Sequence, residues 1–298
     1  MIGELAALGA ALTWTASAVL YKEALSKARP VPVNVVRLLC TSMILLVCLV
    51  VVGRFWALAN LSSYAMWLAG ISGIVGLGFG DTLYMVSLKH IGVARAVPIT
   101  CTYPLFGLLW AILLRGENVT IQLTIGTVAI AMGIWLLSRE ERTNLTDERK
   151  IMIIGVVAAL AAALLWSISI TMVDVAVTLP ETGSLDYALA INTLRTAAGA
   201  VALVIFAPVI DRKPVFLKFE RRTLLALIAG GIVALGLGWF LLAYSFLYIP
   251  GSQAVPISST TPLFSTLVGI TLLHERITAR NVAGSVIIVL AIFVIFII

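Results

Sequence analysis

Charged residues are scarce in this chain, and residues that bind metals or form disulfides are scarcer. Asp, Glu, Lys and Arg make up 11% of the 298 residues, whereas a soluble domain carries about 25%. The three cysteines, Cys40, Cys48 and Cys101, lie in apolar stretches without CxxC spacing. We expect them to be buried apolar side chains rather than disulfides or ligands. The sequence therefore predicts no metal site and no cofactor.

The chain also lacks the features of two large functional classes. It contains no Gly-rich P-loop, so we do not expect ATP to drive it directly. Its net charge is +6, but the basic residues lie in short connections between apolar runs, where the positive-inside rule explains them. No nucleic acid partner is therefore expected.

Apolar residues are abundant. They make up 61% of the chain, and the mean hydropathy is +1.10. A helix that crosses the bilayer needs about 20 largely apolar residues. Such stretches occur at approximately 3–21, 33–53, 65–87, 92–114, 121–138, 151–173, 186–208, 223–246, 251–273 and 280–298. The sequence therefore predicts an all-α integral membrane protein with ten transmembrane helices in contact with the lipid bilayer.

The second half of the chain repeats the first at an offset of 158 positions. The matched segments are 74–80 with 232–238, 96–99 with 254–257, 102–106 with 260–264, and Glu117 with Glu275. Trp14 and Trp166 match at an offset of 152, which indicates a short insertion early in the second copy. An apolar chain duplicated end to end is typical of transporters whose site lies between two repeats.

The number of spans in each copy determines the expected architecture. The polar run from Arg139 to Lys150 separates five spans from five and divides the chain into units 1–143 and 144–298. Because five is odd, the second unit enters the membrane with the opposite orientation. We therefore expect two inverted five-helix repeats around a central cavity, an arrangement in which a monomer could suffice.

Basic residues indicate the orientation of this bundle. Most of the 20 Lys and Arg residues lie in or beside the odd-numbered connections, and only Arg54 and Arg115 lie in the even-numbered ones. The positive-inside rule then places the odd-numbered connections in the cytoplasm and both termini outside. The expected location is the plasma (inner) membrane, spanned many times.

Two arginines inside apolar spans are candidate site residues. Arg37 follows Asn34, and Arg195 follows Asn192, in each case by three residues and therefore on one helix face. An arginine at the bilayer centre costs about 2.5–3.5 kcal/mol, so it usually faces a cavity or a partner. The alternative is that each side chain extends to the nearer membrane surface.

Asp81 is the carboxylate that lies clearly within a span, and its repeat equivalent is Trp239. A buried carboxylate of this kind could carry a coupled proton. The alternative is a structural ion pair with Arg37 or Lys89. Both interpretations stay open on the sequence alone.

Prolines and hydroxyl residues recur at matched places in the fourth and ninth spans. Pro98 and Pro104 match Pro256 and Pro262. A proline bends a helix and frees carbonyls that need protein or water partners. We expect bent helices that line the cavity, with neighbouring hydroxyls available to a ligand. The alternative is that these hydroxyls only satisfy the local backbone.

The residues expected along the substrate path combine these features with two mid-span tryptophans, which suit either a cavity wall or a bundle core. They are Trp14, Asn34, Arg37, Asp81, Tyr84, Pro98, Thr102, Tyr103, Pro104, Trp166, Asn192, Arg195, Trp239, Pro256, Ser259, Thr260 and Pro262. Asp81 is the candidate for proton coupling.

The repeated motifs resemble the EamA-type family of the drug/metabolite transporter superfamily. In each half a Pro-Leu-Phe segment, at 104–106 and 262–264, is followed by a Glu turn and a Gly-containing last helix. The first helices, with Trp14 and Trp166, fit the same family. The resemblance covers nearly the whole chain and implies ten helices in two inverted repeats around a central pocket. Members export amino acids and other metabolites or drugs.

The leading hypothesis is therefore a secondary transporter rather than an enzyme. It would export small metabolites such as amino acids by rocking of the two repeats around a central pocket, either facilitated or linked to a proton. One alternative is a membrane-embedded enzyme acting on lipid-type substrates, although such enzymes gather His or carboxylate clusters that are missing from this sequence. Another is a membrane scaffold that transports nothing.

Overall fold

A computed structural model describes residues 1–107, 109, 121–138, 146–211, 219–272 and 278–297 of the chain. Glu117 and Glu275, which were expected to begin the turns into the last helix of each half, lie outside these residues. Within the described ranges the secondary structure is helical, with no strand.

The described helices of the first half alternate long spans with short segments. They are α1 (Ile2–Lys27), α2 (Pro30–Val51), α3 (Phe55–Ala59), α4 (Ser63–Ser72), η1 (Gly73–Gly80), α5 (Asp81–Ile91), α6 (Val93–Thr100) and α8 (Ile121–Ser138). Local chemistry sets several of these boundaries. Pro30 begins α2, where a missing N–H costs nothing. Ser62 caps α4 by accepting a hydrogen bond from the Ala65 amide. Gly92, with φ of 76°, separates α5 from α6.

The second half follows the same pattern. Its helices are α9 (Thr146–Thr178), α10 (Leu185–Ile210), α11 (Arg221–Gly231), η2 (Ile232–Gly238), α12 (Trp239–Ser245), α13 (Gly251–Ser258), α14 (Thr261–Thr271) and α15 (Ala279–Ile297). In both halves a π-helix interrupts the third span, because α4, η1 and α5 run on without a break, as do α11, η2 and α12.

Six helical stretches in the described part of the chain are long and apolar enough to cross a membrane. They are Ile2–Lys27, Pro30–Val51, Ser63–Ile91, Arg149–Thr178, Leu185–Ile210 and Arg221–Ser245. Their outer faces are apolar. On α2, for example, Met43, Val47 and Val50 recur at helical spacing and are each more than 60% exposed. The chain is therefore a multi-pass membrane protein whose exposed apolar stripes contact lipid.

The fourth and ninth spans differ from the expected bent helices, because they are broken rather than bent. α6 ends at Thr100, and a turn at Cys101 and Thr102 precedes further helical residues. The last part of the expected span 92–114 lies outside the described residues. The ninth span likewise breaks between α13 and α14.

The prolines explain this break. Pro262 is in the first turn of α14 and has no N–H to donate to the carbonyl of Ser258. The Thr261 hydroxyl donates to that carbonyl instead, at 2.8 Å. Both halves therefore place a turn at the same point of the repeat, next to Pro104 and Pro262.

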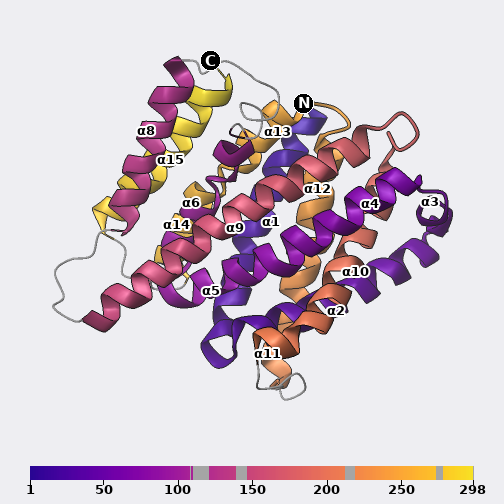
Figure 1. Ribbon diagram of the computed structural model, residues 1–298, viewed down its shortest axis with the longest axis horizontal. Coiled ribbons are helices and arrows are strands. Elements are labelled where there is room, and N and C mark those ends of the chain that lie inside the picture. The colour runs from indigo at the N-terminus through magenta and orange to yellow at the C-terminus, as the bar shows by residue number, and fades with distance from the viewer. Residues whose placement is uncertain (108, 110–120, 139–145, 212–218, 273–277, 298) are drawn as a thin grey trace.

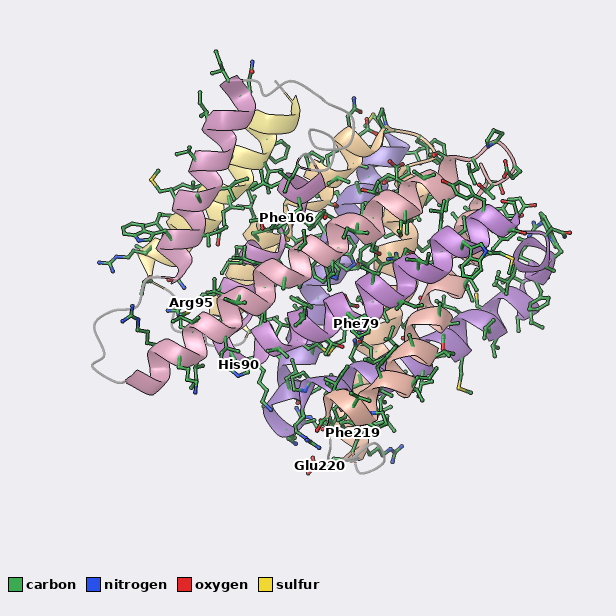
Figure 2. The ribbon with its side chains drawn as sticks, in the orientation of Figure 1. Phe79, His90, Arg95, Phe106, Phe219 and Glu220 are labelled. Carbon is green, nitrogen blue, oxygen red and sulfur yellow. The ribbon has the colours of Figure 1, made fainter. Side chains whose placement is uncertain are left out.

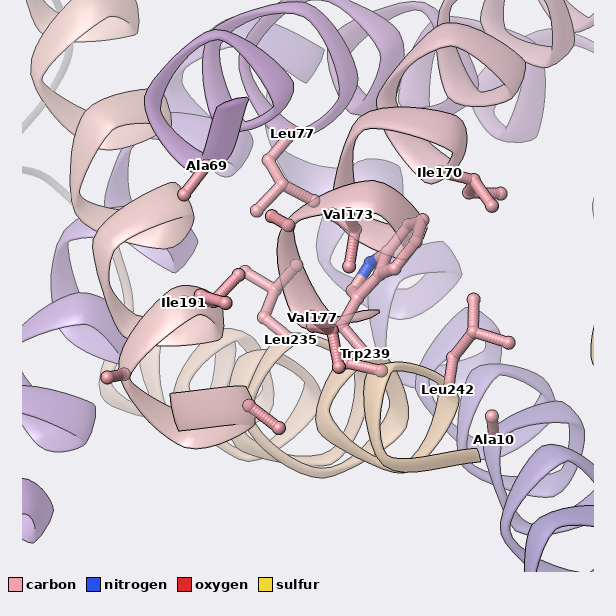
Figure 3. Packing of buried hydrophobic residues seen from close by; sticks show 14 of the residues in the cluster. Ala10, Ala69, Leu77, Ile170, Val173, Val177, Ile191, Leu235, Trp239 and Leu242 are labelled. Carbon is pink, nitrogen blue, oxygen red and sulfur yellow. The ribbon is translucent and has the colours of Figure 1, made fainter. Parts of the chain in front are cut away.

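The helices surround two buried apolar clusters. In Figure 1, α9 crosses the molecule between the paired α8 and α15 on one side and α2, α10 and α11 on the other. One cluster includes Leu77, Val173, Leu235 and Leu242, which Figure 3 shows around Trp239. The second cluster lies around α1, α5 and α6. Trp14 and Trp166 pack against both clusters, and so they lie where the two meet.

Three ion pairs join the α1–α2 region to the region between α10 and α11. Lys27 pairs with Glu220 at 2.8 Å, Arg222 pairs with Glu23 at 3.0 Å, and Arg29 pairs with Asp211. Figure 2 shows Glu220 and Phe219 at this edge of the molecule, and Figure 1 shows both termini at the opposite edge. These three ion pairs therefore connect the two halves on the side away from the termini.

Candidate functional site

A small cavity lies at the centre of the helices, with a volume of about 40 Å³. Its lining residues are Trp14, Ser17, Tyr21, Arg37, Asp81, Tyr84, Val97, Thr100, Cys101, Tyr103, Trp166, Ile170, Ala234, Leu235, Trp239 and Thr261. Both halves of the chain contribute to this wall. The volume has room for water but not for a metabolite.

A buried ion pair is the main polar feature of the wall. The Arg37 guanidinium donates to the Asp81 carboxylate, and both side chains are almost fully buried. Arg37 also donates to Asn34 Oδ1 at 2.7 Å, and its Cζ lies 4.8 Å from the centre of the Tyr21 ring. From the other half of the chain, Trp166 Nε1 donates to Asp81 Oδ1 at 2.8 Å. The Asp81 carboxylate thus receives hydrogen bonds from both halves.

The π-helix η1 positions Asp81. The Asp81 amide donates to the carbonyl of Gly76, five residues earlier. This shifted register leaves carbonyls that need other donors. Asn34 Nδ2 supplies them, with distances of 2.9 Å to the carbonyl of Leu77 and 3.1 Å to that of Gly78. The Asn34 side chain therefore links the π-helix to the arginine that pairs with Asp81.

The same construction occurs 158 residues later. The Trp239 amide donates to the carbonyl of Ala234 at the end of η2. Asn192 Nδ2 donates to the carbonyl of Leu235 at 2.8 Å, and Arg195 follows Asn192 by three residues. Trp239 therefore holds the position of Asp81, and Arg195 the position of Arg37.

The second arginine differs from the first in its partners. Arg195 is fully buried, its Nη2 donates to Ser169 Oγ at 2.9 Å, and its Cζ lies 4.2 Å from the Trp239 ring. Among the described residues, no carboxylate lies within ion-pair distance of this guanidinium. Its Nε and Nη1 have no hydrogen-bond partner there, and neither does Trp14 Nε1.

Close glycine contacts bring these elements together across the two halves. A Cβ at Gly73 would lie 1.8 Å from the Arg195 carbonyl oxygen, so η1 and α10 touch through their backbones. At the matched position, a Cβ at Gly231 would lie 2.2 Å from Thr41 Oγ1 and 3.2 Å from Arg37 Cγ. Small residues permit this close approach, and each arginine therefore lies against the π-helical span of the opposite half.

Seven of the expected path residues line the cavity. These are Trp14, Arg37, Asp81, Tyr84, Tyr103, Trp166 and Trp239. Their rings contact one another, with centroids 5.1 Å apart for Trp14 and Trp239 and also for Tyr84 and Trp166. The structural alternative for Asp81, a pair with Arg37, is present. Lys89 instead donates to the carbonyl of Ala28.

The other expected path residues do not line the cavity. Asn34, Asn192 and Arg195 are buried against the π-helices, and Pro98, Pro104, Pro256 and Pro262 are buried at the broken helices. The hydroxyls of Thr102, Ser259 and Thr260 donate to backbone carbonyls of their own helical segments. Their hydroxyls thus satisfy the local backbone here.

Tyr21 is a wall residue that the sequence analysis missed. Its ring packs on Arg37, and its hydroxyl donates to the carbonyl of Gly230 at 2.5 Å. Trp14, Ser17 and Tyr21 are spaced three, four and seven residues apart, which places them on one helix face. That spacing was the available signal. Thr100, Cys101 and Thr261 at the helix breaks are further wall residues.

Comparisons with known proteins identify the family of the chain. The model of the EamA-like transporter family matches residues 1–139 and 153–297. An uncharacterized transporter of Archaeoglobus fulgidus is 26% identical over 223 residues, which cover 74% of this chain and 73% of that protein. A crystal structure of another protein aligns with a TM-score of 0.64 at 19% identity, over 98% of this chain and 95% of that one. The chain belongs to the EamA-like transporter family of the drug/metabolite transporter superfamily, and it is a membrane transporter.

Proposed function

We propose that this protein is a secondary transporter that exports small metabolites such as amino acids. Its ten helices would form two inverted five-helix repeats, residues 1–143 and 144–298, that rock around the central cavity. Support comes from the contacts that recur at an offset of 158, above all the asparagine-to-π-helix bonds of Asn34 and Asn192.

The observation that carries this proposal is the bond between Trp166 and Asp81. Trp166 belongs to the first helix of the second half, and Asp81 to the third span of the first half. A movement of one half against the other would break this 2.8 Å hydrogen bond and open the aromatic wall around it. The cavity would then grow to hold a solute.

Transport would be either facilitated or linked to a proton on Asp81. The carboxylate is contacted by Arg37 from α2 and by Trp166 from α9. Tyr21 from α1 packs on Arg37, and Tyr84 from α5 lines the same cavity. When Trp166 leaves and water enters, Asp81 could exchange a proton with one side of the membrane. A charged Asp81 would restore the bond to Arg37 and favour the closed state.

The proposed placement is the plasma (inner) membrane. The ion-paired side that carries Lys27 and Glu220 would face the cytoplasm, and both termini would lie outside. The three ion pairs on that side would hold the cytoplasmic end closed in this state. One chain would contain both repeats, so a monomer could suffice for the mechanism.

The test is solute flux in proteoliposomes that contain the full chain. A radiolabelled amino-acid and metabolite panel would be measured with and without a pH gradient, for wild type and Asp81→Asn. Asp186→Asn is the matched control, because Asp186 forms a partly exposed pair with Arg54 at 3.2 Å, away from the cavity. We expect saturable flux in wild type and in the control.

The dependence of the flux on the pH gradient distinguishes proton-linked transport from facilitated transport. Flux that follows the gradient and is lost in Asp81→Asn indicates a proton-linked carrier. Flux that ignores the gradient and survives in Asp81→Asn indicates a facilitator. Wild-type protein that moves no compound of the panel would contradict the proposal and favour a scaffold, or an enzyme if a compound were chemically changed.

A further inference from the structure

The second half of the site contains hydrogen-bond donors that lack an acceptor. Arg195 is fully buried, and only its Nη2 has a hydrogen bond, to Ser169. Arg195 Nε and Nη1, together with Trp14 Nε1, have no partner among the residues that the structure describes. Buried donors, and charged ones above all, are normally paired. This region therefore has the character of an incomplete site.

The first half has a carboxylate in the matching place, although Arg37 Nε also lacks a partner among the described residues. There a single carboxylate, that of Asp81, accepts hydrogen bonds from Arg37 and from Trp166 Nε1. Arg195 is the repeat equivalent of Arg37, and Trp14 is the repeat equivalent of Trp166. Arg195 and Trp14 thus supply the two matching donors, one from each half of the chain, but Trp239 replaces the carboxylate.

Trp239 contacts both of these donors. Its ring lies 4.2 Å from Arg195 Cζ and 5.1 Å from the centre of the Trp14 ring. Trp239 lines the cavity whereas Arg195 does not, so the indole separates the guanidinium from the cavity. In Figure 3 Trp239 lies among apolar side chains such as Val173 and Leu242.

We propose that the transported solute carries a carboxylate, and that Arg195 and Trp14 Nε1 bind it in the place that corresponds to Asp81. The Trp239 side chain turns aside to admit it. Arg37 and Asp81 neutralise each other, which leaves Arg195 as the excess positive charge of the site. This inference rests on the proposed transport function, and it names the chemical group that the site selects.

The binding test compares carboxylates with neutral amides of the same shape. The midpoint of thermal unfolding of the purified full chain in detergent would be measured against acetate and acetamide, and against benzoate and benzamide, at matched ionic strength. We expect a carboxylate to raise the midpoint with a half-saturating concentration at least tenfold below that of its amide. Equal effects of both members of each pair, or no effect of either carboxylate, would overturn the proposal.

Substitution of Trp239 provides a test that loss of folding cannot imitate. Trp239→Asp supplies Arg195 with the acceptor that Arg37 already has, so the folded variant should no longer respond to carboxylates. Asp186→Asn, which changes a carboxylate away from the cavity, is the control, and its response should stay within about threefold of wild type. A folded Trp239→Asp variant that still responds like wild type would contradict the proposal.

Transport assays separate this inference from the function on which it rests. A chain that transports neutral or cationic solutes, and ignores every carboxylate, would overturn the carboxylate site and leave the transport function intact. A chain that binds benzoate through Arg195 but moves no solute would support the site and overturn the transport function.

Discussion

The two halves of this protein contain matching arrangements of an asparagine, an arginine and a π-helix, but they differ in the partner of the arginine. In the first half, Asn34 anchors a π-helix and Arg37 meets the carboxylate of Asp81. In the second half, Asn192 anchors the matching π-helix, but Arg195 meets the ring of Trp239. The backbone arrangement is shared, and the charge balance is not. A duplicated fold can therefore keep its packing while one substitution, between Asp and Trp, changes the role of a buried cation.

Replacement of each arginine by methionine tests this comparison most strongly. Arg37→Met leaves Asp81 buried without its charge partner, and we expect it to lower the free energy of unfolding by about 3–5 kcal/mol. Arg195→Met removes a buried charge that has no carboxylate beside it. We expect its free energy of unfolding to stay within about 1 kcal/mol of wild type, or to rise. Equilibrium unfolding in mixed micelles measures both.

Each variant is a control for the change in side-chain volume in the other, because both replace a buried arginine in a helix by methionine. Equal losses of stability in Arg37→Met and Arg195→Met would contradict the charge asymmetry between the halves.

Alanine at the matched glycines should affect the two halves unequally as well. A methyl group at Gly73 meets the Arg195 backbone carbonyl, which cannot move without separating η1 from α10. We expect Gly73→Ala to cost about 1–3 kcal/mol or more. The methyl group of Gly231→Ala meets chiefly the Thr41 side chain, which can rotate, so its cost should be smaller.

Gly78→Ala is the control for this series, because the nearest atom would lie 3.6 Å from its Cβ, at ordinary contact distance. The thermal unfolding midpoints of the three variants give the order of their stabilities. A Gly231→Ala variant less stable than Gly73→Ala would show that the contact with α10 is not the tighter one.

The two asparagines should differ by less. Asn34 donates to two carbonyls and to Thr82 Oγ1, and its Oδ1 accepts from Arg37. Asn192 donates to carbonyls of η2, while its Oδ1 has no partner within the described residues. We expect Asn34→Ala to cost about 1 kcal/mol more than Asn192→Ala, because it loses at least one further net hydrogen bond. Unfolding curves of both variants would check the difference, and equal costs would contradict it.

The smallest effect is expected at the ion pairs between the halves. Lys27 holds the pKa of the Glu220 carboxyl below its ordinary value by a hydrogen bond and by charge attraction. The stabilisation by this pair is present above the ordinary glutamate pKa and is lost as the pH falls through the lowered one. The unfolding midpoint of wild type should therefore fall slightly more than that of Lys27→Met between about pH 5 and pH 3.5. A fall that is the same in both would show that the exposed pair contributes nothing.

Much of this site could be predicted from the sequence, because it follows from duplication and from the cost of polar groups in lipid. The offset of 158 pointed to the asparagines, the arginines and the exchange of Asp81 for Trp239. Six of the ten expected spans correspond to long apolar helices of the described structure, and seven of the expected path residues line the cavity. Each of these inferences needed only helix length and the rarity of charge in membranes.

The remaining features depend on information that a residue pattern does not contain. The repeat pairs the glycine-rich segments 74–80 and 232–238, but the switch to π-helical bonding there depends on contacts with α10 and α2. Whether two prolines bend a helix or break it depends on which hydroxyls satisfy the freed carbonyls, as Thr261 does for Ser258. Tyr21 was missed because a single tyrosine carries no repeat signal.

The most direct test of the account is the flux ratio between a carboxylate solute and its amide in proteoliposomes. It would be measured for wild type and for Arg195→Met, with the amounts of folded protein matched. We predict a ratio well above ten for wild type and a ratio near one for Arg195→Met. A ratio that Arg195→Met leaves unchanged would contradict the claim that the second half of the site is completed by the solute.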